Sequence, residues 1–413
     1  MLSAGKKTLL LNLAAVFLWG GFAVAVFVRV ILAGGTHRSA YDCFYFAGEH
    51  FLQQLPLYAG ESHGYQYYPG FAAAMTVLTL LPFAVGALVW TAVNFAVFLS
   101  GAWRFAGQFI PPPQRAWFFI ALLPIAFEGL LNQQSNPLLG GAILWGVALV
   151  AQHKWWRGIA ALTVAGWIKV APLCYALLVG AIFPKRLWWR GAVVLTLAVG
   201  GVFLCQNYEY VVAGYRDWLD MCRRLSNDRH DYRDMFTLYE YLTVGAITSG
   251  APVAEMTWYH LAQLLAAGLA LAFTLKVYYR DQWDAGRAVL FAYAAGAWWL
   301  MSFGPSTEIP TITLMAAGPA WALVAAREMK NAGGGGGAFW LMAIAYFLLL
   351  LGANGDIDYH LRRAFSPANT APVIMLPLGN VLYGIWLFGF YARRKKNLST
   401  NSHETAVSVL AKF

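Results

Sequence analysis

Long apolar runs alternate with short polar segments along almost the whole chain. The first run covers residues 8–32, and others recur to about residue 391. About 20 apolar residues cross the hydrocarbon core of a bilayer. Because backbone groups in lipid must pair within their own segment, continuous runs predict helices rather than barrel strands. The pattern predicts an all-α polytopic membrane protein with roughly 11–13 membrane segments. These form one domain over residues 1–396, followed by a polar cytoplasmic tail over 397–413.

Two apolar stretches do not fit a single clean crossing. Residues 68–106 are interrupted near Leu81-Pro82, which predicts either two crossings or one full span and a partial one. Residues 158–183 are interrupted by Lys169 and Pro172, which predicts two half-helices meeting near Lys169. Irregular backbone at membrane depth survives only beside protein or a water-filled cavity. Lys169 therefore predicts a polar chamber inside the bundle.

The charges support a membrane protein and exclude a nucleic-acid partner. Only 12% of the residues are charged, about half the usual fraction of a soluble protein. The net charge of +10 comes mostly from short Lys/Arg clusters between apolar runs, which is typical of cytoplasmic loops. The four cysteines have no metal-like spacing, although Cys43 and Cys222 are both expected in outer loops. We expect no metal and no cofactor, since phosphate-binding glycine loops, zinc motifs and nucleophile elbows are all missing.

The first outer loop, residues 37–69, combines a carboxylate with many aromatic side chains. Apolar residues at helix-like spacing predict a short interfacial helix over 41–54, ended by Pro56. The tyrosines that follow are expected at headgroup level. Asp42 comes soon after the first span, where a carboxylate can act as general base for an acceptor hydroxyl. The alternative is a helix cap or a carboxylate that faces water. Glu49 lies two turns later on the same face and either assists or is solvated.

Polar residues inside or between the apolar runs are the next candidates. Lys169 suits a phosphate group, and the alternative is that its ammonium snorkels to the headgroup layer. Gln133 and Asn136 lie in a turn between two apolar runs. They are placed to bind sugar hydroxyls or, equally well, to cap the following helix before Pro137.

The later outer loops contain further charged candidates. In the loop 207–254, arginines and aspartates are interleaved, so either a salt-bridged amphipathic helix forms or some arginines, Arg233 among them, bind a lipid phosphate. Glu308 lies in an outer turn, where it either binds sugar hydroxyls or favours a helix N-terminus. His360, with two neighbouring arginines, is a candidate of the same kind in the last outer loop.

The order of these motifs resembles glycosyltransferase family 87, the polyprenyl-phosphate-mannose-dependent α-mannosyltransferases of the C-type superfamily. The resemblance rests on Asp42-x-x-Tyr45-x-Ala47, Leu-Pro-Leu-Tyr58, Tyr67-Tyr68-Pro69, Gln133-x-x-Asn136 and Ile168-Lys169-Val170-Ala171-Pro172, and it is strongest over about the first 190 residues. Two features depart from the family pattern. Gly70 stands where a second proline is frequent, and Ser306-Thr307-Glu308-Ile309-Pro310 replaces a Ser-Trp-x-His-His-like stretch.

The resemblance implies a C-type fold and a metal-independent, inverting transfer of a hexose, here mannose, from a polyprenyl phosphate to a lipid or glycan hydroxyl. It implies that Asp42 is the base, with Tyr45 and Tyr68 among the substrate contacts. It also implies a bacterial plasma membrane protein with its active site on the outer face. Two alternatives remain. A transporter or flippase predicts paired interrupted helices in two related halves. A ligase that transfers a whole glycan places the chemistry on the arginines of 207–254.

Overall fold

In the computed structural model, all regular secondary structure among the described residues is helical. The structure describes residues 4–36, 39–58, 64–225, 233–245, 247, 253–304, 307–333, 335–364 and 371–392, and contains no strand among them. The predicted tail, 397–413, lies outside the described residues. The all-α prediction is therefore confirmed for the part of the chain that is described.

The helices follow one another with short connections. The α-helices are α1 (Ala4–Leu32), α2 (Tyr41–Gln53), α3 (Pro69–Thr79), α4 (Phe83–Phe109), α5 (Arg115–Leu131), α6 (Asn136–Ala151), α7 (Trp155–Ile168), α8 (Leu173–Ile182), α9 (Pro184–Gly201), α10 (Tyr208–Leu225), α11 (Met235–Val244), α12 (Val253–Leu275), α13 (Ala285–Phe303), α14 (Ala317–Asn331), α15 (Gly336–Gly352), α16 (Gly355–Ala364) and α17 (Ala371–Gly384). Short 3-10 turns are η1 (Pro112–Gln114), η2 (Val202–Leu204) and η4 (Ile309–Leu314). The π-helical turns η3 (Lys276–Arg280) and η5 (Ile385–Tyr391) continue α12 and α17.

Six helices among the described residues are long and apolar enough to cross a membrane, or seven if a bent pair is counted. They are Gly5–Leu32, Phe83–Phe109, Pro112–Leu131, Pro184–Leu204, Ala254–Arg280 and Val373–Tyr391, and the bent pair is Gly336–Gly352 with Gly355–Leu361. Shorter apolar helices such as α6 are surrounded by protein, and 13 of the 16 residues of α6 are buried. α6 is therefore an interior helix of the bundle.

Both interrupted stretches of the sequence are broken in the structure. Leu80 to Pro82 separate the 11-residue α3 from the 27-residue α4, which corresponds to one full span and a partial one. Lys169 to Pro172 separate α7 from α8, and Lys169 has an extended backbone. Proline restricts the residue before it and ends regular structure. The predicted break at Lys169 is thus confirmed.

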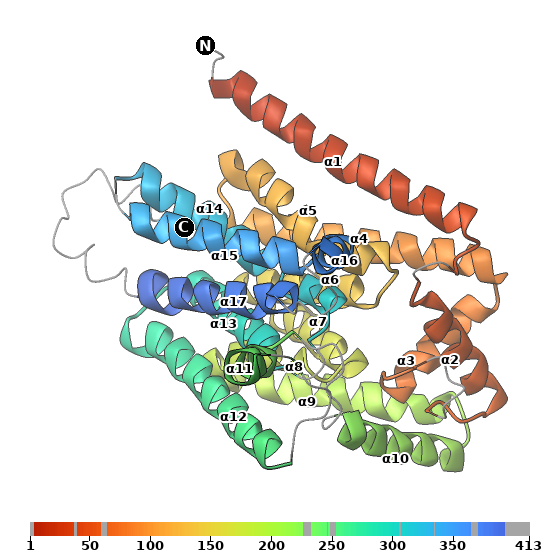
Figure 1. Ribbon diagram of the computed structural model, residues 1–413. Helices are drawn as coiled ribbons and strands as arrows, with labels where there is room; N and C mark the ends of the chain where they lie inside the picture. The colour runs from red at the N-terminus through yellow and green to blue at the C-terminus, as the bar shows by residue number, and fades with distance from the viewer. Residues whose placement is uncertain are drawn as a thin grey trace.

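Helices α2, α3 and α10 lie together at the end of the bundle where α1 and α9 end (Figure 1, right). The expected helix after the first span is α2, which packs on α3, and α10 lies against both. The Gln206 side chain donates to the Phe51 carbonyl at 2.9 Å, and Tyr210 Oη donates to the Leu55 carbonyl at 2.9 Å. These bonds fix α10 to the C-terminal end of α2.

The tyrosines of the first outer loop do not face the membrane interface as expected. Tyr65, Tyr67 and Tyr68 are only 2%, 9% and 5% exposed. The Tyr65 hydroxyl donates to the Tyr68 carbonyl, and the Tyr68 ring packs against Trp167. The loop is therefore a folded core layer that supports α2 and α3. All four cysteines are free thiols, Cys43 and Cys222 included.

Candidate functional site

Asp42 occupies the first turn of α2, opposite the buried stripe of that helix. The buried residues of α2 are Tyr41, Cys43, Phe44, Ala47, Gly48 and Phe51. With 3.6 residues per turn, Asp42 projects from the other face, and its side chain is half-buried. Its Oδ1 accepts the Cys43 amide at 2.8 Å, and a carboxylate in the first turn is favoured by the helix dipole. Asp42 does not cap the helix, because the N-cap residue is Ala40, and one carboxylate oxygen remains outside the bond to Cys43.

The turn between α5 and α6 fixes the start of α2. The Ala40 amide donates to the Asn132 carbonyl at 3.0 Å, and the Ser39 hydroxyl donates to Gln133 Oε1 at 2.6 Å. Gln133 has a left-handed backbone, with φ 52°, and is 1% exposed. Its Nε2 donates to the Ala87 carbonyl and to Thr91 Oγ1. Because its polar atoms are all used by the protein, Gln133 positions the turn rather than presenting itself to a ligand.

Asn136 begins α6 and has a different environment. It is 2% exposed, and its Oδ1 has no hydrogen-bond partner among the described residues. The neighbouring Ser135 is fully buried next to Tyr67. The turn therefore places unsatisfied polar atoms beside the folded loop that precedes α3.

Lys169, Glu308 and Tyr67 come together from three separate segments. Glu308 is exposed, at the start of η4, and its carboxylate is close enough to act electrostatically on both Lys169 and Tyr67. The Tyr68 amide contacts the Ile168 carbonyl, which brings the loop before α3 to the break after α7. No described side chain forms an ion pair with Lys169 within 4 Å. The structure thus brings a cation, a carboxylate and a phenol together where the loop before α3, the break after α7 and the start of η4 meet.

Tyr67 connects this group to α2. Burial raises the pKa of the Tyr67 phenol, the Ser135 hydroxyl beside it acts in the opposite direction, and Cys43 and Glu308 raise it further. A phenol with a raised pKa stays protonated at neutral pH and can donate a hydrogen bond. The Cys43 thiol is close enough to Tyr67 to act on it electrostatically, and Asp42 is the residue before Cys43. Sequence reasoning chose Tyr68 and missed Tyr67.

Four other predicted site residues have protein partners or lie apart. The Tyr68 hydroxyl bonds the Tyr215 hydroxyl, which explains its burial. The Tyr45 ring packs on Phe83, and Glu49 lies one turn further along the same face of α2. His360 is exposed on α16 and contacts the Tyr359 ring.

Arg233 is engaged by a buried carboxylate. Its Nη1 and Nη2 lie 3.4 and 3.2 Å from Asp358 Oδ1 and Oδ2, and the two side chains are 5% and 9% exposed. The Arg233 amide also donates to the Thr307 carbonyl at 2.8 Å. A lipid phosphate would have to compete with this buried pair, so phosphate binding by Arg233 stays a prediction. In the structure, Arg233 joins α16 to the segment that carries Glu308.

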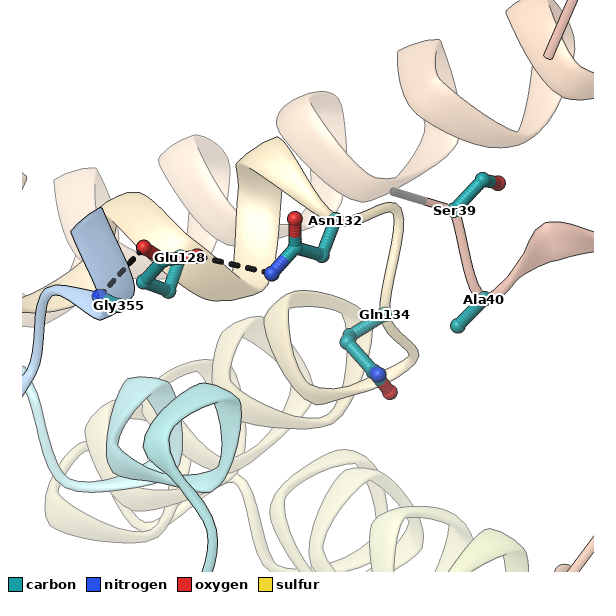
Figure 2. A pocket seen from close by; sticks show the side chains of 6 residues that line it. All are labelled: Ser39, Ala40, Glu128, Asn132, Gln134 and Gly355. Atoms are coloured by element: carbon teal, nitrogen blue, oxygen red, sulfur yellow. Dashed lines mark hydrogen bonds between the residues drawn. The ribbon is translucent and has the colours of Figure 1, made fainter. Parts of the chain in front are cut away.

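A cavity of about 390 Å³ opens beside the start of α2. Figure 2 shows its lining, which is Ser39, Ala40, Glu128, Asn132, Gln134 and Gly355. Glu128, 4% exposed, accepts the Gly355 amide at 2.7 Å and Asn132 Nδ2 at 2.8 Å. Sequence reasoning missed Glu128, although an acid near the end of an apolar run is a signal of function.

Metal binding finds no support in the described residues, which contain no group of three or more His, Cys, Asp or Glu side chains that could hold an ion. The described residues here include a half-buried carboxylate, Asp42, a cation, Lys169, and a polar cavity that Ala40 lines two residues before Asp42. A general base, a cation for a leaving anion and a hydroxyl-binding surface are the parts that group transfer from a phosphate to an alcohol needs.

A family model and a solved structure match this chain. The curated proteins give no match. The crystal structure of ArnT from Cupriavidus metallidurans bound to undecaprenyl phosphate aligns with a TM-score of 0.38 and 13% sequence identity, over 91% of this chain and 78% of that chain. The family model of glycosyltransferase family 87 matches residues 65–302. The chain, an integral membrane protein by its spans, therefore belongs to glycosyltransferase family 87.

Proposed function

We propose that this membrane glycosyltransferase moves a hexose, mannose in the first instance, from a polyprenyl phosphate to a hydroxyl of a lipid or glycan acceptor. In the reaction, the acceptor oxygen attacks the anomeric carbon and forms the new glycosidic bond. The bond from that carbon to the phosphate oxygen breaks on the opposite side, so the anomeric configuration inverts. Asp42 takes the proton that the acceptor hydroxyl loses, and the polyprenyl phosphate leaves.

The proposal is supported by two polar regions near the start of α2, where Asp42 is half-buried. The first contains Lys169, a cation without an ion-pair partner among the described residues. A leaving phosphate gains negative charge as the bond breaks, and a nearby ammonium stabilises it. The second is the cavity that Ala40 lines with Glu128 and Gln134. A single displacement needs one base, and we assign that role to Asp42.

The polar residues around Lys169 suit the sugar of the donor. Glu308 is exposed beside Lys169, and its carboxylate can accept hydrogen bonds from sugar hydroxyls. Asn136 supplies an unsatisfied amide oxygen nearby, and Tyr67 supplies a phenol. By the positive-inside rule, the Lys/Arg clusters in the loops predicted to be cytoplasmic favour a site on the outer face, where a bacterial plasma membrane enzyme would build envelope glycans.

The test compares Asp42→Asn with the unmodified protein in membranes given labelled polyprenyl-phosphate mannose. General-base catalysis typically contributes about 10²–10⁴ in rate, so transfer should fall by that factor while donor binding stays. The matched control is Asp220→Asn, which changes an exposed carboxylate on α10 that pairs with Arg223. Retained turnover in Asp42→Asn would reject the base assignment.

Lys169→Met tests the other half of the site. Removing the ammonium should raise the KM for the donor and lower kcat, because the phosphate loses its neutralising partner in both ground and transition states. A variant with unchanged donor KM and unchanged kcat would show that Lys169 does not contact the phosphate.

A further inference from the structure

The cavity in Figure 2 has walls from three separate parts of the chain. Ser39 and Ala40 come from the segment before α2, Asn132 and Gln134 from the turn after α5, and Gly355 from the start of α16. A volume of about 390 Å³ falls in the range of small-molecule sites. The cavity is therefore large enough for a hexose ring.

The described wall of this cavity offers no cation to a phosphate. Among the lining residues, Glu128 is the charged one, and no described lysine or arginine lines the wall. The Gly355 amide at the start of α16, a position that often binds anions, already donates to Glu128 Oε1. A sugar hydroxyl, by contrast, can donate to a carboxylate and exchange hydrogen bonds with a carboxamide. The cavity is thus suited to a neutral, hydroxyl-rich ligand.

The hydrogen-bonding groups of the wall are fixed in position. The Gly355 amide and Asn132 Nδ2 hold Glu128 at 2.7 and 2.8 Å. A Cβ at position 355 would lie 3.1 Å from Glu128 Oε1, so the glycine permits this close approach. Each carboxylate oxygen can accept more than one hydrogen bond. Because the carboxylate is already held in place, ligand binding loses less side-chain conformational entropy than it would with a mobile side chain.

Gln134 is the lining residue most available to a ligand. Its backbone amide donates to the Gly129 carbonyl at 3.1 Å, whereas its side chain has no hydrogen-bond partner among the described residues and extends along the cavity wall in Figure 2. A carboxamide both donates and accepts, which suits vicinal sugar hydroxyls.

We infer that this cavity is the acceptor subsite, where Glu128 and Gln134 bind the hydroxyls of a neutral hexoside and direct its nucleophilic oxygen toward Asp42. The inference rests on the proposed transfer reaction and assigns its two substrates to opposite sides of Asp42. The donor phosphate lies with Lys169, and the acceptor sugar lies with Glu128. Ala40 provides the link, because it lines the cavity two residues before Asp42.

Two variants test the subsite by direct binding, which does not require turnover. The probes are methyl α-D-manno-, gluco- and galactopyranoside, titrated by saturation-transfer NMR into the purified full chain, and polyprenyl phosphate is titrated in parallel. Gln134→Leu should weaken binding of the best hexoside by about fivefold, the typical loss for one neutral hydrogen bond. Glu128→Gln should weaken it by more, since hydrogen bonds to a charged acceptor are stronger. Neither change should alter the affinity for polyprenyl phosphate.

The matched control is Glu328→Gln. Glu328 is a carboxylate bound by one side-chain amide, that of Gln114, near the other end of α5, so hexoside affinity should stay unchanged. The inference is overturned if the unmodified protein binds none of the three hexosides, if Gln134→Leu and Glu128→Gln leave their binding unchanged, or if Gln134→Leu weakens polyprenyl phosphate binding equally. Gln134→Leu also guards against misfolding of Glu128→Gln, because its side chain supports no described bond.

A transfer assay then separates this inference from the proposed function. With octyl α-D-mannopyranoside as the acceptor probe, Gln134→Leu should raise the KM for the probe about fivefold and leave the KM for the donor unchanged. If Asp42→Asn retains full transfer, the base assignment fails, while the hexoside titrations still decide whether the cavity binds the acceptor.

Discussion

The Asn132 carbonyl accepts a 3.0 Å hydrogen bond from the Ala40 amide. This bond joins the turn after α5 to the start of α2, two residues before Asp42. The Trp90 indole donates to the Gln133 carbonyl at 2.7 Å and ties the same turn to α4. These hydrogen bonds run from α4 through the turn after α5 to the start of α2, so they fix the segment that leads into Asp42.

Replacing Gln133 by Met should destabilise the fold and slow transfer together. The change removes the bonds to Ser39, Ala87 and Thr91, and leaving buried polar partners unsatisfied costs about 1–3 kcal/mol for each group. Thermal unfolding in detergent should show a clearly lower midpoint, and kcat should fall more than the donor affinity, because Asp42 is displaced.

Gln282→Met is the matched control for this change. Gln282 has a similar left-handed backbone, with φ 55°, but it is exposed and its side chain donates only to the Tyr279 carbonyl. A midpoint as low as that of Gln133→Met would show that the backbone conformation, rather than the buried bonds, is responsible.

Replacing Arg233 by Met should destabilise the protein more than it affects donor binding. Removing one partner of a buried pair leaves an uncompensated charge and typically costs about 3–5 kcal/mol. The double variant Arg233→Met with Asp358→Leu should recover much of that loss, as measured by the unfolding midpoint. Arg223→Met is the control, because Arg223 and Asp220 are 77% and 61% exposed and such pairs contribute about 0–1 kcal/mol. A donor KM raised without loss of stability would instead place Arg233 on the phosphate.

The broken helix at Lys169 could be predicted from sequence, whereas the partner of Arg233 could not. A lysine and a proline inside an apolar run violate the rules for a continuous span, so the local pattern alone locates the break. Arg233 and Asp358 are 125 residues apart, and nothing near either residue indicates the other. Each alone looks like an exposed loop charge that is available to a substrate.

The tyrosines of the first outer loop illustrate a second limit. A cluster of tyrosines beside a membrane span, such as Tyr65 and Tyr67, is typical of the aromatic belt at a membrane interface. In the structure, however, packing of α2 on α3 buries both side chains. Glu128 shows the reverse case. The sequence places it near the end of α5, but the cavity beside it needs α16, more than 220 residues later. Contacts between residues so far apart in the sequence determine which carboxylates line a cavity, and the local sequence does not reveal them.

Close approach of α4 and α6 should make Gly141 intolerant of a side chain. A Cβ there would lie 2.4 Å from the Val97 carbonyl oxygen, and one at Gly101 would lie 2.3 Å from the Gly141 carbonyl oxygen. Small residues let membrane helices pack closely, and overpacking typically costs about 1–3 kcal/mol. Gly141→Ala should therefore lower the unfolding midpoint. Gly107→Ala on α4, where nothing lies within 4 Å, should leave it unchanged or raise it. Equal midpoints for the two variants would contradict the close approach.

Cys43 should react with maleimide much more slowly than Cys205. Burial, and to a smaller extent the Asp42 carboxylate, raise the pKa of the Cys43 thiol to about 12. Because the thiolate is the reactive form, only about one molecule in ten thousand is ionised at pH 8. The labelling rate of a variant with Cys43 as its single cysteine should rise about tenfold per pH unit up to pH 11. A variant with only Cys205, which is exposed, should label faster at pH 8.

The same measurement locates Asp42 without any substrate. The Asp42 carboxylate disfavours the neighbouring thiolate, so its charge raises the pKa of Cys43. Asp42→Asn removes that charge, lowers the pKa, and should speed the labelling of Cys43 at fixed pH. Glu49→Gln, which alters a more distant carboxylate on the same helix, should have a smaller effect. If Asp42→Asn leaves the Cys43 rate unchanged, the Asp42 carboxylate lies too far from the Cys43 thiol to act on it, which would contradict the position of Asp42 in the structure.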